Sequence, residues 1–194
     1  MLDELEHNRK LVPYVDMPIQ HIDDEILKRM KRGTPRKLIE ERIATLRARI
    51  PGIALRTTLI VGFPGETDAA FESLLAFLAQ AQFERLGCFT YSPEQGSAAA
   101  LLDDDVPRAV KEARRARVMD LQRRLIDERN ARLEGSVVRV IVDRLGDQGP
   151  IGRTQADAPD IDCAILLAGD AAPGEIRDAR VVGRSGYDLR GTLL

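Results

Sequence analysis

The nine residues Leu59–Thr67, LIVGFPGET, are the stretch of the chain best suited to hold a ligand. Apolar residues run into a Gly-Phe-Pro-Gly turn, which is followed by an acid and a threonine. Gly62 and Gly65 permit a positive φ or a close approach of the backbone to a ligand. The free N–H groups of a helix that begins after such a turn favour polar or anionic partners. Two interpretations remain open, a ligand-holding turn and a tight structural turn with a capped helix.

The spacing of the turn limits its chemistry. It matches neither GxGxxG nor a Walker A loop, so it gives little support to a nucleotide-phosphate site. Polar residues follow two other predicted strands, at Asp16, Gln20 and His21 and at Tyr91, Ser92 and Glu94. Ligands of βα folds bind beyond the carboxyl ends of the strands, so these groups are expected to converge with the turn.

Arg56 and the cysteines narrow the chemistry further. Arg56 lies within an apolar strand, where it needs a carboxylate partner or a ligand. Cys88 and Cys163 are the only two cysteines, and they form no CxxC or CxxxC cluster with each other. The chain is therefore expected to hold no metal by itself, and to be a reduced cytoplasmic protein.

Size and charge exclude other classes. With 194 residues and a net charge of −2, the chain has no strong global field directed at nucleic acid or a membrane. No apolar run approaches the roughly 20 residues that a spanning helix needs, so no membrane partner is expected.

The residues before position 134 alternate between strand and helix patterns. Strands are predicted over 14–21, 53–62 and 85–92. Helices are predicted over 23–30 and 35–50, from Thr67 or Asp68 through the apolar stripe that ends at Leu78, and over about 107–133. Thr34 is the expected N-cap of the second helix, and Thr67 or Asp68 that of the third. This order predicts an α/β fold of parallel βα units. Three strands are few for such a sheet, so they are expected to form part of a larger sheet or barrel.

The pattern of residues along the sequence changes at Gly135. Short β-rich runs alternate with Gly, Pro and Asp turns from there to the end of the chain. This pattern is typical of a small all-β barrel or sandwich. The expected domains are therefore residues 1–134, a βα portion with its connecting helix, and residues 135–194, a β domain.

Four segments together carry a family resemblance: YVDMPIQH, LRTTLIVGFPGET, RLGCFTYSPEQGSAA and GRTQADAPDID. In this order they closely resemble the radical-SAM methylthiotransferases, within them the branch that modifies an aspartate of small-subunit ribosomal protein twelve. The resemblance runs essentially from end to end. It implies an α/β fold in which the later strands of a radical-SAM (β/α) barrel are followed by a small all-β TRAM barrel.

The resemblance also implies cofactors. The parent enzyme uses S-adenosylmethionine and two [4Fe–4S] clusters to place a methylthio group on an aspartate β-carbon. This chain has no CxxxCxxC motif, so the cluster ligands are absent from it. We therefore expect the carboxyl-terminal portion of the enzyme, inactive by itself. The residues carried over as cofactor-binding are Gln20, Arg56, Gly62, Phe63 and Tyr91; Glu66 is expected to hold the turn.

The charge of the second domain bears on the substrate. From residue 135 onward there are seven arginines, no lysine and nine acids, with Tyr187 as the one aromatic residue. RNA binding depends on a basic face and on stacking, so tRNA is disfavoured and a basic ribosomal protein is favoured. The residues expected to bind the substrate are Arg153, Asp157, Asp160 and Asp162.

The predicted helix over 107–133 is evidence against excluding an RNA partner. Between Arg108 and Arg132 it carries nine basic residues against four acids. This charge run is either a solvated face or a surface that approaches ribosomal RNA on the ribosome. Two alternatives therefore stay open, a tRNA-adenosine methylthiotransferase and a non-catalytic module that binds a ribosomal protein.

Overall fold

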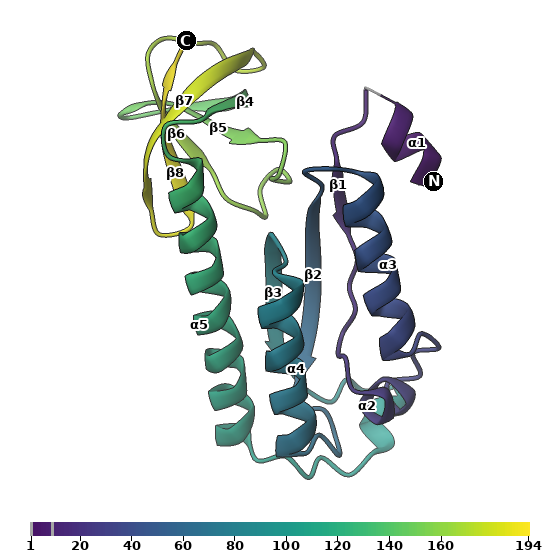
Figure 1. Ribbon diagram of the computed structural model, residues 1–194. Helices are drawn as coiled ribbons and strands as arrows, with labels where there is room; N and C mark the ends of the chain where they lie inside the picture. The colour runs from purple at the N-terminus through teal and green to yellow at the C-terminus, as the bar shows by residue number, and fades with distance from the viewer. Residues whose placement is uncertain (1, 9) are drawn as a thin grey trace. The chain divides into compact units, whose positions relative to one another are not determined.

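The computed structural model describes residues 2–8 and 10–194, which form two compact units. One unit contains Asp3–Tyr14 and Arg123–Leu194, and the other contains Val15–Gln122. Helix α1 (Leu2–His7) lies at the N-terminal end of the chain, and the long helix α5 (Arg108–Leu133) contributes residues to both units (Figure 1).

A three-stranded sheet is the centre of the Val15–Gln122 unit. Its order is β1 (Tyr14–Asp16), β2 (Ala54–Val61) and β3 (Arg85–Thr90), and β2 and β3 are parallel. The helices that connect and cover these strands are α2 (Asp24–Arg29), α3 (Arg36–Arg49) and α4 (Asp68–Ala81). The parallel βα arrangement confirms the predicted α/β class.

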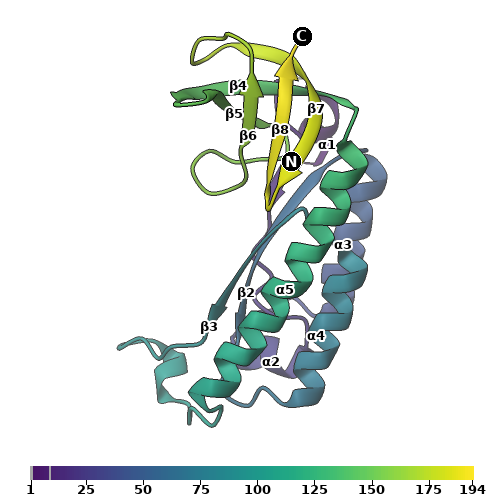
Figure 2. The same ribbon diagram turned by 90° about the vertical axis from the view of Figure 1, so that its left-hand side faces the viewer.

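The two faces of this sheet differ. Along β2, Leu55, Leu59 and Val61 are fully buried, whereas the alternate residues Arg56, Thr58 and Ile60 are only partly buried. Figure 2 shows α3, α4 and α5 together on one side of β2 and β3. Only one face of the sheet is therefore packed against helices, as expected for part of a larger barrel.

One predicted helix start is wrong and another is correct. The N-cap of α3 is Pro35 rather than Thr34, and Pro35 makes no side-chain capping bond. Instead, Oδ1 of Asp24 accepts the N–H of Arg36 at 2.7 Å, so an acid from α2 caps the helix. Thr67 is the N-cap of α4, and its hydroxyl accepts the N–H of Ala70.

The buried side of α5 is largely polar. Val118 is fully buried as expected, but Val110, Leu121 and Leu125 are only partly buried. Ile126 is also buried, and long or amide side chains fill the other buried positions, namely Lys111, Arg114, Gln122 and Asn130. A search for apolar periodicity could not find this face, because its contacts are hydrogen bonds and ion pairs.

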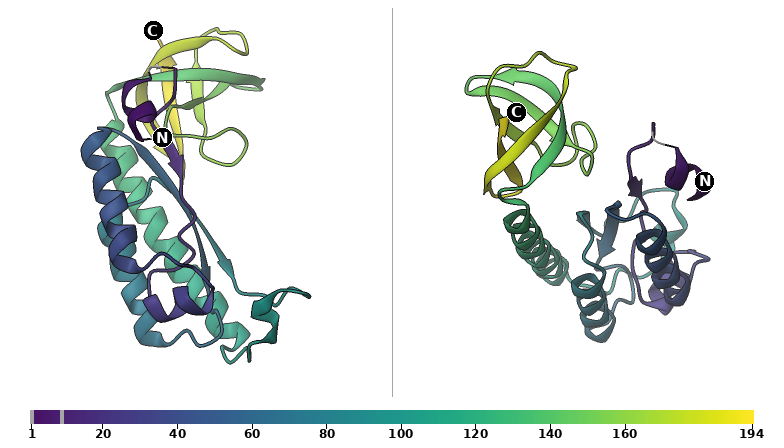
Figure 3. Two further views of the ribbon diagram at one scale, coloured as in Figure 1. Left: turned by 90° about the vertical axis from the view of Figure 1, so that its right-hand side faces the viewer. Right: turned by 45° about the horizontal axis from the view of Figure 1, so that its top comes forward.

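The residues after Gly135 form a closed five-stranded barrel, shown in the right-hand view of Figure 3. Its strands are β4 (Val137–Gly146), β5 (Gly149–Thr154), β6 (Ile165–Ala168), β7 (Ile176–Ser185) and β8 (Asp188–Leu193), in the order β4-β5-β6-β8-β7. Val140, Ile165 and Val181 are among its core residues. The predicted small β barrel is confirmed. Among the helices of residues 2–8 and 10–194, none is long and apolar enough to cross a membrane.

Candidate functional site

The glycine turn lies at the carboxyl end of β2, the central strand of the sheet. Gly62 and Gly65 have φ values of +70° and +84°, so both adopt the left-handed conformation that the sequence predicted. The N–H of Glu66 bonds the carbonyl of Phe63 at 2.9 Å and closes the turn. Helix α4 then begins at Asp68, so strand, turn and helix follow one another without an intervening loop.

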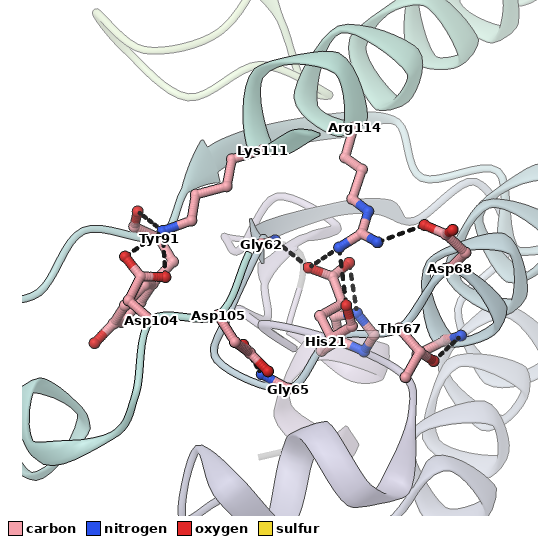
Figure 4. Close-up of polar contacts among 12 residues, drawn as sticks. His21, Gly62, Gly65, Thr67, Asp68, Tyr91, Asp104, Asp105, Lys111 and Arg114 are labelled. Atoms are coloured by element: carbon pink, nitrogen blue, oxygen red, sulfur yellow. Dashed lines mark hydrogen bonds and ion pairs between the residues drawn. The ribbon is translucent and has the colours of Figure 1, made fainter. Parts of the chain in front are cut away.

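Glu66 holds this turn from inside the protein, where it contacts Gly62 and Arg114, both of which are labelled in Figure 4. Its side chain is fully buried, and one carboxylate oxygen accepts the N–H of Gly62. The guanidinium of Arg114 lies 3.5 Å from the same carboxylate and also bonds the Glu66 carbonyl and Asp68. The expectation that Glu66 holds the turn agrees with this geometry.

His21 completes the cluster around Glu66. Its Nδ1 accepts the N–H of Asp23 at 3.0 Å, so in the neutral ring the proton is on Nε2. That Nε2 lies 3.6 Å from Oε1 of Glu66, and both side chains are fully buried. Neither atom has a hydrogen-bond partner in the described structure. His21 therefore faces Glu66 beneath the turn and does not reach solvent.

Lys111 ties the end of β3 to α5. Its ammonium bonds Asp104 at 2.6 Å and the carbonyl of Tyr91 at 3.3 Å, and it lies 4.9 Å from the centroid of the Tyr91 ring. Asp105, next to Asp104, accepts the N–H of Gly65 at 2.7 Å. The first turns of α5 and the acids before them thus fix the ends of two neighbouring strands.

Both glycines of the turn are closely covered by side chains. A Cβ at Gly62 would overlap Cγ of Lys111, and one at Gly65 would lie 2.7 Å from Cζ of Arg29. The close approach that glycine permits is therefore an approach to two cationic side chains. This contact is distinct from the expected approach to a ligand.

The five predicted cofactor-binding residues separate into two groups. Gln20 and Phe63 line a cavity of about 470 Å³, together with Ile60 and residues from α2 and from the segment after β3. Arg56 bonds Asp16 at 2.6 Å, the carboxylate partner that its position required. Gly62 lies under Lys111, and neither it nor Arg56 or Tyr91 lines this cavity. The cofactor roles of all five remain predictions.

Tyr91 is a buried residue. It is 8% exposed, its hydroxyl donates to the carbonyl of Ala99 at 2.8 Å, and its ring meets that of Phe63 edge to face at 5.0 Å. These contacts position Phe63 at the cavity wall. The structure therefore gives Tyr91 a supporting place behind Phe63.

The cysteines do not fit an iron–sulfur cluster. Burial raises the pKa of the Cys88 thiol to about 12, which disfavours the thiolate that a metal needs. Cys163 lies in the other compact unit. Over residues 2–8 and 10–194, no three His, Cys, Asp or Glu residues are grouped as a metal site. No step of a reaction is therefore assigned to a cluster held by these residues.

The predicted substrate-binding residues lie in and around the β barrel. Arg153 and Asp157 line a cavity of about 590 Å³, together with Tyr14, Arg139 and Ile176. Arg153 pairs with Asp143, and Asp157 accepts the hydroxyl of Thr154.

Two acids of the segment 157–162 shape their own loop. Asp162 accepts the Tyr14 hydroxyl at 2.7 Å and the N–H of Ala158 at 2.8 Å, and Asp157 is 8% exposed. Asp160 is exposed and has a φ of +66°. Of the three predicted acids, only Asp160 presents its side chain to solvent without a contact of this kind; the substrate roles of all three, and of Arg153, remain predictions.

Sequence reasoning missed Arg29, Lys111 and Arg114 as parts of the site. Lys111 and Arg114 belong to a charge run that resembles a solvated helix face, and only the fold shows that they are 5% and 6% exposed. Their spacing of three residues on one helix face was the one available signal.

Comparisons with known proteins define the class. The radical SAM superfamily model matches residues 1–78, and the TRAM domain model matches residues 135–194. Coproporphyrinogen III oxidase (HemN) from Escherichia coli, described as a radical SAM enzyme, has a similar fold with a TM-score of 0.51. That similarity covers 61% of this chain and 28% of HemN at 22% identity, so it bears on the fold alone.

Curated relatives define the family. The chain is 44% identical to ribosomal protein uS12 methylthiotransferase RimO of Cellvibrio japonicus, over 94% of this chain and 41% of the relative. It is 42% identical to RimO of Chlorobium phaeovibrioides, over 100% of this chain and 45% of the relative. The chain belongs to the radical-SAM methylthiotransferase family and is similar to RimO. It spans less than half the length of these relatives.

Proposed function

We propose that this chain contributes the S-adenosylmethionine-facing strand ends and the substrate-facing TRAM barrel of an enzyme that methylthiolates an aspartate β-carbon in ribosomal protein uS12. The observation that carries the proposal is the similarity to RimO over nearly all of the chain. The names of those relatives give uS12 as the substrate, and modification on the ribosome and a cytoplasmic location belong to the same proposal.

The cavity at the carboxyl end of β2 supports a cofactor role. An amide from Gln20 and the aromatic ring of Phe63 line it, which suits a ligand with both polar and apolar parts. In this proposal Gln20 and Phe63 contact S-adenosylmethionine, whereas Arg56, Gly62 and Tyr91 fix the strand ends around it. S-adenosylmethionine supplies the radical chemistry of the class when bound.

The iron–sulfur clusters lie outside this chain in the proposal. Radical SAM chemistry uses a cluster with cysteine ligands, and two clusters are proposed for the complete enzyme. The two cysteines of this chain cannot supply either set. We therefore propose that the chain does not catalyse the reaction by itself.

A binding experiment tests the cofactor part. Calorimetry of the chain with S-adenosylmethionine is expected to show binding, weakened by Phe63→Ala. Ala98→Gly, which removes a single methyl group from the cavity lining, is the control and is expected to bind normally. Absence of binding by the unaltered chain would contradict the cofactor part.

A second experiment separates the two substrate classes. Purified uS12 and total tRNA are compared by fluorescence anisotropy at several salt concentrations. We expect uS12 to bind more tightly, since the barrel domain carries a net charge of −2 and one aromatic residue. Tighter binding of tRNA would favour the tRNA-adenosine branch. Binding of uS12 without any binding of S-adenosylmethionine would favour the non-catalytic module.

A further inference from the structure

The cavity lined by Gln20 and Phe63 has a cationic wall of its own. Arg29, Lys31 and Arg32 line it at the end of α2, and all three side chains are exposed. Ser97 and four apolar residues in or next to the short 3-10 helix η1 (Ala98–Leu101) also line the cavity, namely Ala98, Ala99, Leu101 and Leu102. The residues that line the cavity include no acid. Three positive charges therefore border a cavity whose remaining lining is neutral.

None of these three cations is neutralised by a described residue. Other cations of the same unit have acid partners: Arg36 pairs with Glu40, Lys111 with Asp104, and Arg114 with Asp68. Arg29, Lys31 and Arg32 make no ion pair or side-chain hydrogen bond in the part of the chain that the structure describes. Fields from unpaired like charges add in a concave site, so the cavity favours an anion.

The three acids after Leu102 do not compensate for these charges. Asp103–Asp105 directly follow the lining segment that ends at Leu102. Asp104 is engaged by Lys111, and Asp105 accepts the N–H of Gly65. None of the three lines the cavity.

Arg29 is held in place by the glycine turn. Its guanidinium lies against Gly65, where any Cβ would come within 3.0 Å of three of its atoms. A flat cation that rests on a backbone without an acid partner keeps its N–H donors available. Gly65 thus has a second reason to be glycine besides its positive φ.

We propose that Arg29, Lys31 and Arg32 bind a carboxylate of the ligand that occupies this cavity, with Ile60, Phe63 and Leu102 packing against its apolar part. The inference rests on the proposed function, which places the reacting groups at these strand ends. Two ligands there carry a carboxylate, namely the aspartate side chain of the substrate and the amino-acid end of S-adenosylmethionine.

The experiment follows amide chemical shifts of the ¹⁵N-labelled chain. One arm titrates N-acetyl-L-aspartate N-methylamide against its asparagine analogue, with S-adenosylmethionine present. The other arm titrates S-adenosylmethionine against decarboxylated S-adenosylmethionine. We expect at least one carboxylate ligand to bind about tenfold more tightly than its counterpart without the carboxylate, because charge-assisted hydrogen bonds are the stronger kind.

Variants assign this preference to the cations. Lys31→Ala with Arg32→Ala is expected to reduce it to about twofold or less. Lys28→Ala is the matched control, because Lys28 is an exposed cation near the end of α2, three residues before Lys31, but does not line the cavity. Preference in the first arm assigns the cations to the substrate, and preference in the second arm assigns them to the cofactor.

Two results would overturn the inference. One is equal affinity for the ligands with and without the carboxylate in both arms, and the other is the same loss in the Lys28→Ala control. A chain that binds S-adenosylmethionine and its decarboxylated form equally well would refute the carboxylate site in that arm and leave the proposed function standing. A chain that binds neither form would contradict the proposed function itself.

Discussion

At the scale of single residues, Glu66 is the side chain on which the turn depends most. It is a buried anion held between the N–H of Gly62, the guanidinium of Arg114 and the ring of His21. Removing one partner of a buried charge pair leaves the other charge without compensation. Glu66→Ala is therefore expected to lower the free energy of unfolding by about 3 kcal/mol, measured by urea denaturation.

The matched control for Glu66 is Glu72→Gln on α4. Glu72 pairs with Arg117, but both side chains are more than half exposed. Exposed pairs contribute little, so Glu72→Gln is expected to leave the denaturation midpoint unchanged. Equal effects of the two substitutions would show that Glu66 is not a buried anchor.

Gly62 provides a second prediction at this scale. Gly62→Ala must adopt a φ of +70° and also place a methyl group against Lys111. Gly52→Ala has the same backbone problem, with a φ of +79°, but its new methyl would meet nothing within 4 Å. We expect Gly52→Ala to reduce stability by about 1 kcal/mol and Gly62→Ala by about 1–3 kcal/mol more.

A double substitution tests the cause of that difference. Lys111→Ala removes the side chain that a residue at position 62 would meet. Gly62→Ala should then cost less in the Lys111→Ala background than in the unaltered chain, measured as a coupling energy by urea denaturation. Additive effects would mean that the contact with Lys111 is not the source of the strain.

Cys88 makes stability depend on alkaline pH. Burial raises its pKa from the ordinary value of 9.0 to about 12, so between these values the folded protein keeps a proton that the unfolded chain loses. Stability from this group is therefore full below pH 9 and falls as the pH rises toward 12. The unfolding free energy of the chain should fall less over this range in Cys88→Ala; parallel curves for the two proteins would contradict the shift.

At the scale of elements, the βα order could be predicted from the sequence because the residues of β2 and α4 by themselves favour the strand and the helix that they form. The apolar run of β2 and the threonine that caps α4 each indicate the observed element. The cap of α3 could not be predicted, because its acid comes from α2, twelve residues away. Local residue preference alone indicated Thr34 as the N-cap of α3, but the capping hydrogen bond is made by a tertiary contact with Asp24.

The first turns of α5 hold the ends of two strands in place through hydrogen bonds. The residues that make these bonds could not be predicted from the sequence. Lys111 bonds the carbonyl after β3, and Arg114 bonds the turn after β2. Their charges resemble those of the exposed arginines on the same helix. Sequence alone does not distinguish them, because the partners are backbone carbonyls and distant acids.

Lys111→Ala tests whether Lys111 attaches the segment after β3 to α5. Without its bonds to Asp104 and the Tyr91 carbonyl, residues 92–106 lose their attachment to α5. We expect faster hydrogen–deuterium exchange in that segment by mass spectrometry. Arg117→Ala removes an exposed pair with Glu72 and a contact with the Phe71 ring on α4, neither of which involves residues 92–106, so it should leave the exchange of 92–106 unchanged. Uniformly faster exchange over the whole chain would indicate general destabilisation instead.

At the scale of the whole molecule, the two units differ in how completely they close. The barrel is a closed ring in which β4 pairs with both β5 and β7, whereas the sheet β1-β2-β3 ends at β3 within the described residues. Both outcomes agree with the sequence, which showed a full set of short strands after Gly135 but only three strands before it. The charge of the barrel domain was also available from the sequence, whereas the cationic wall beside Phe63 required the fold.

The edge strand β3 carries the last prediction. Phe89 on β3 is 61% exposed, and it pairs in register with Ile60 on the sheet. An unpaired edge with exposed apolar side chains favours association with another copy. The chain should therefore self-associate with increasing concentration in analytical ultracentrifugation, and Phe89→Asp should shift it toward monomer. Leu145→Asp is the control, because Leu145 is 62% exposed on the closed barrel. If the unaltered chain stays monomeric, or if both substitutions act alike, the open sheet is not the associating surface.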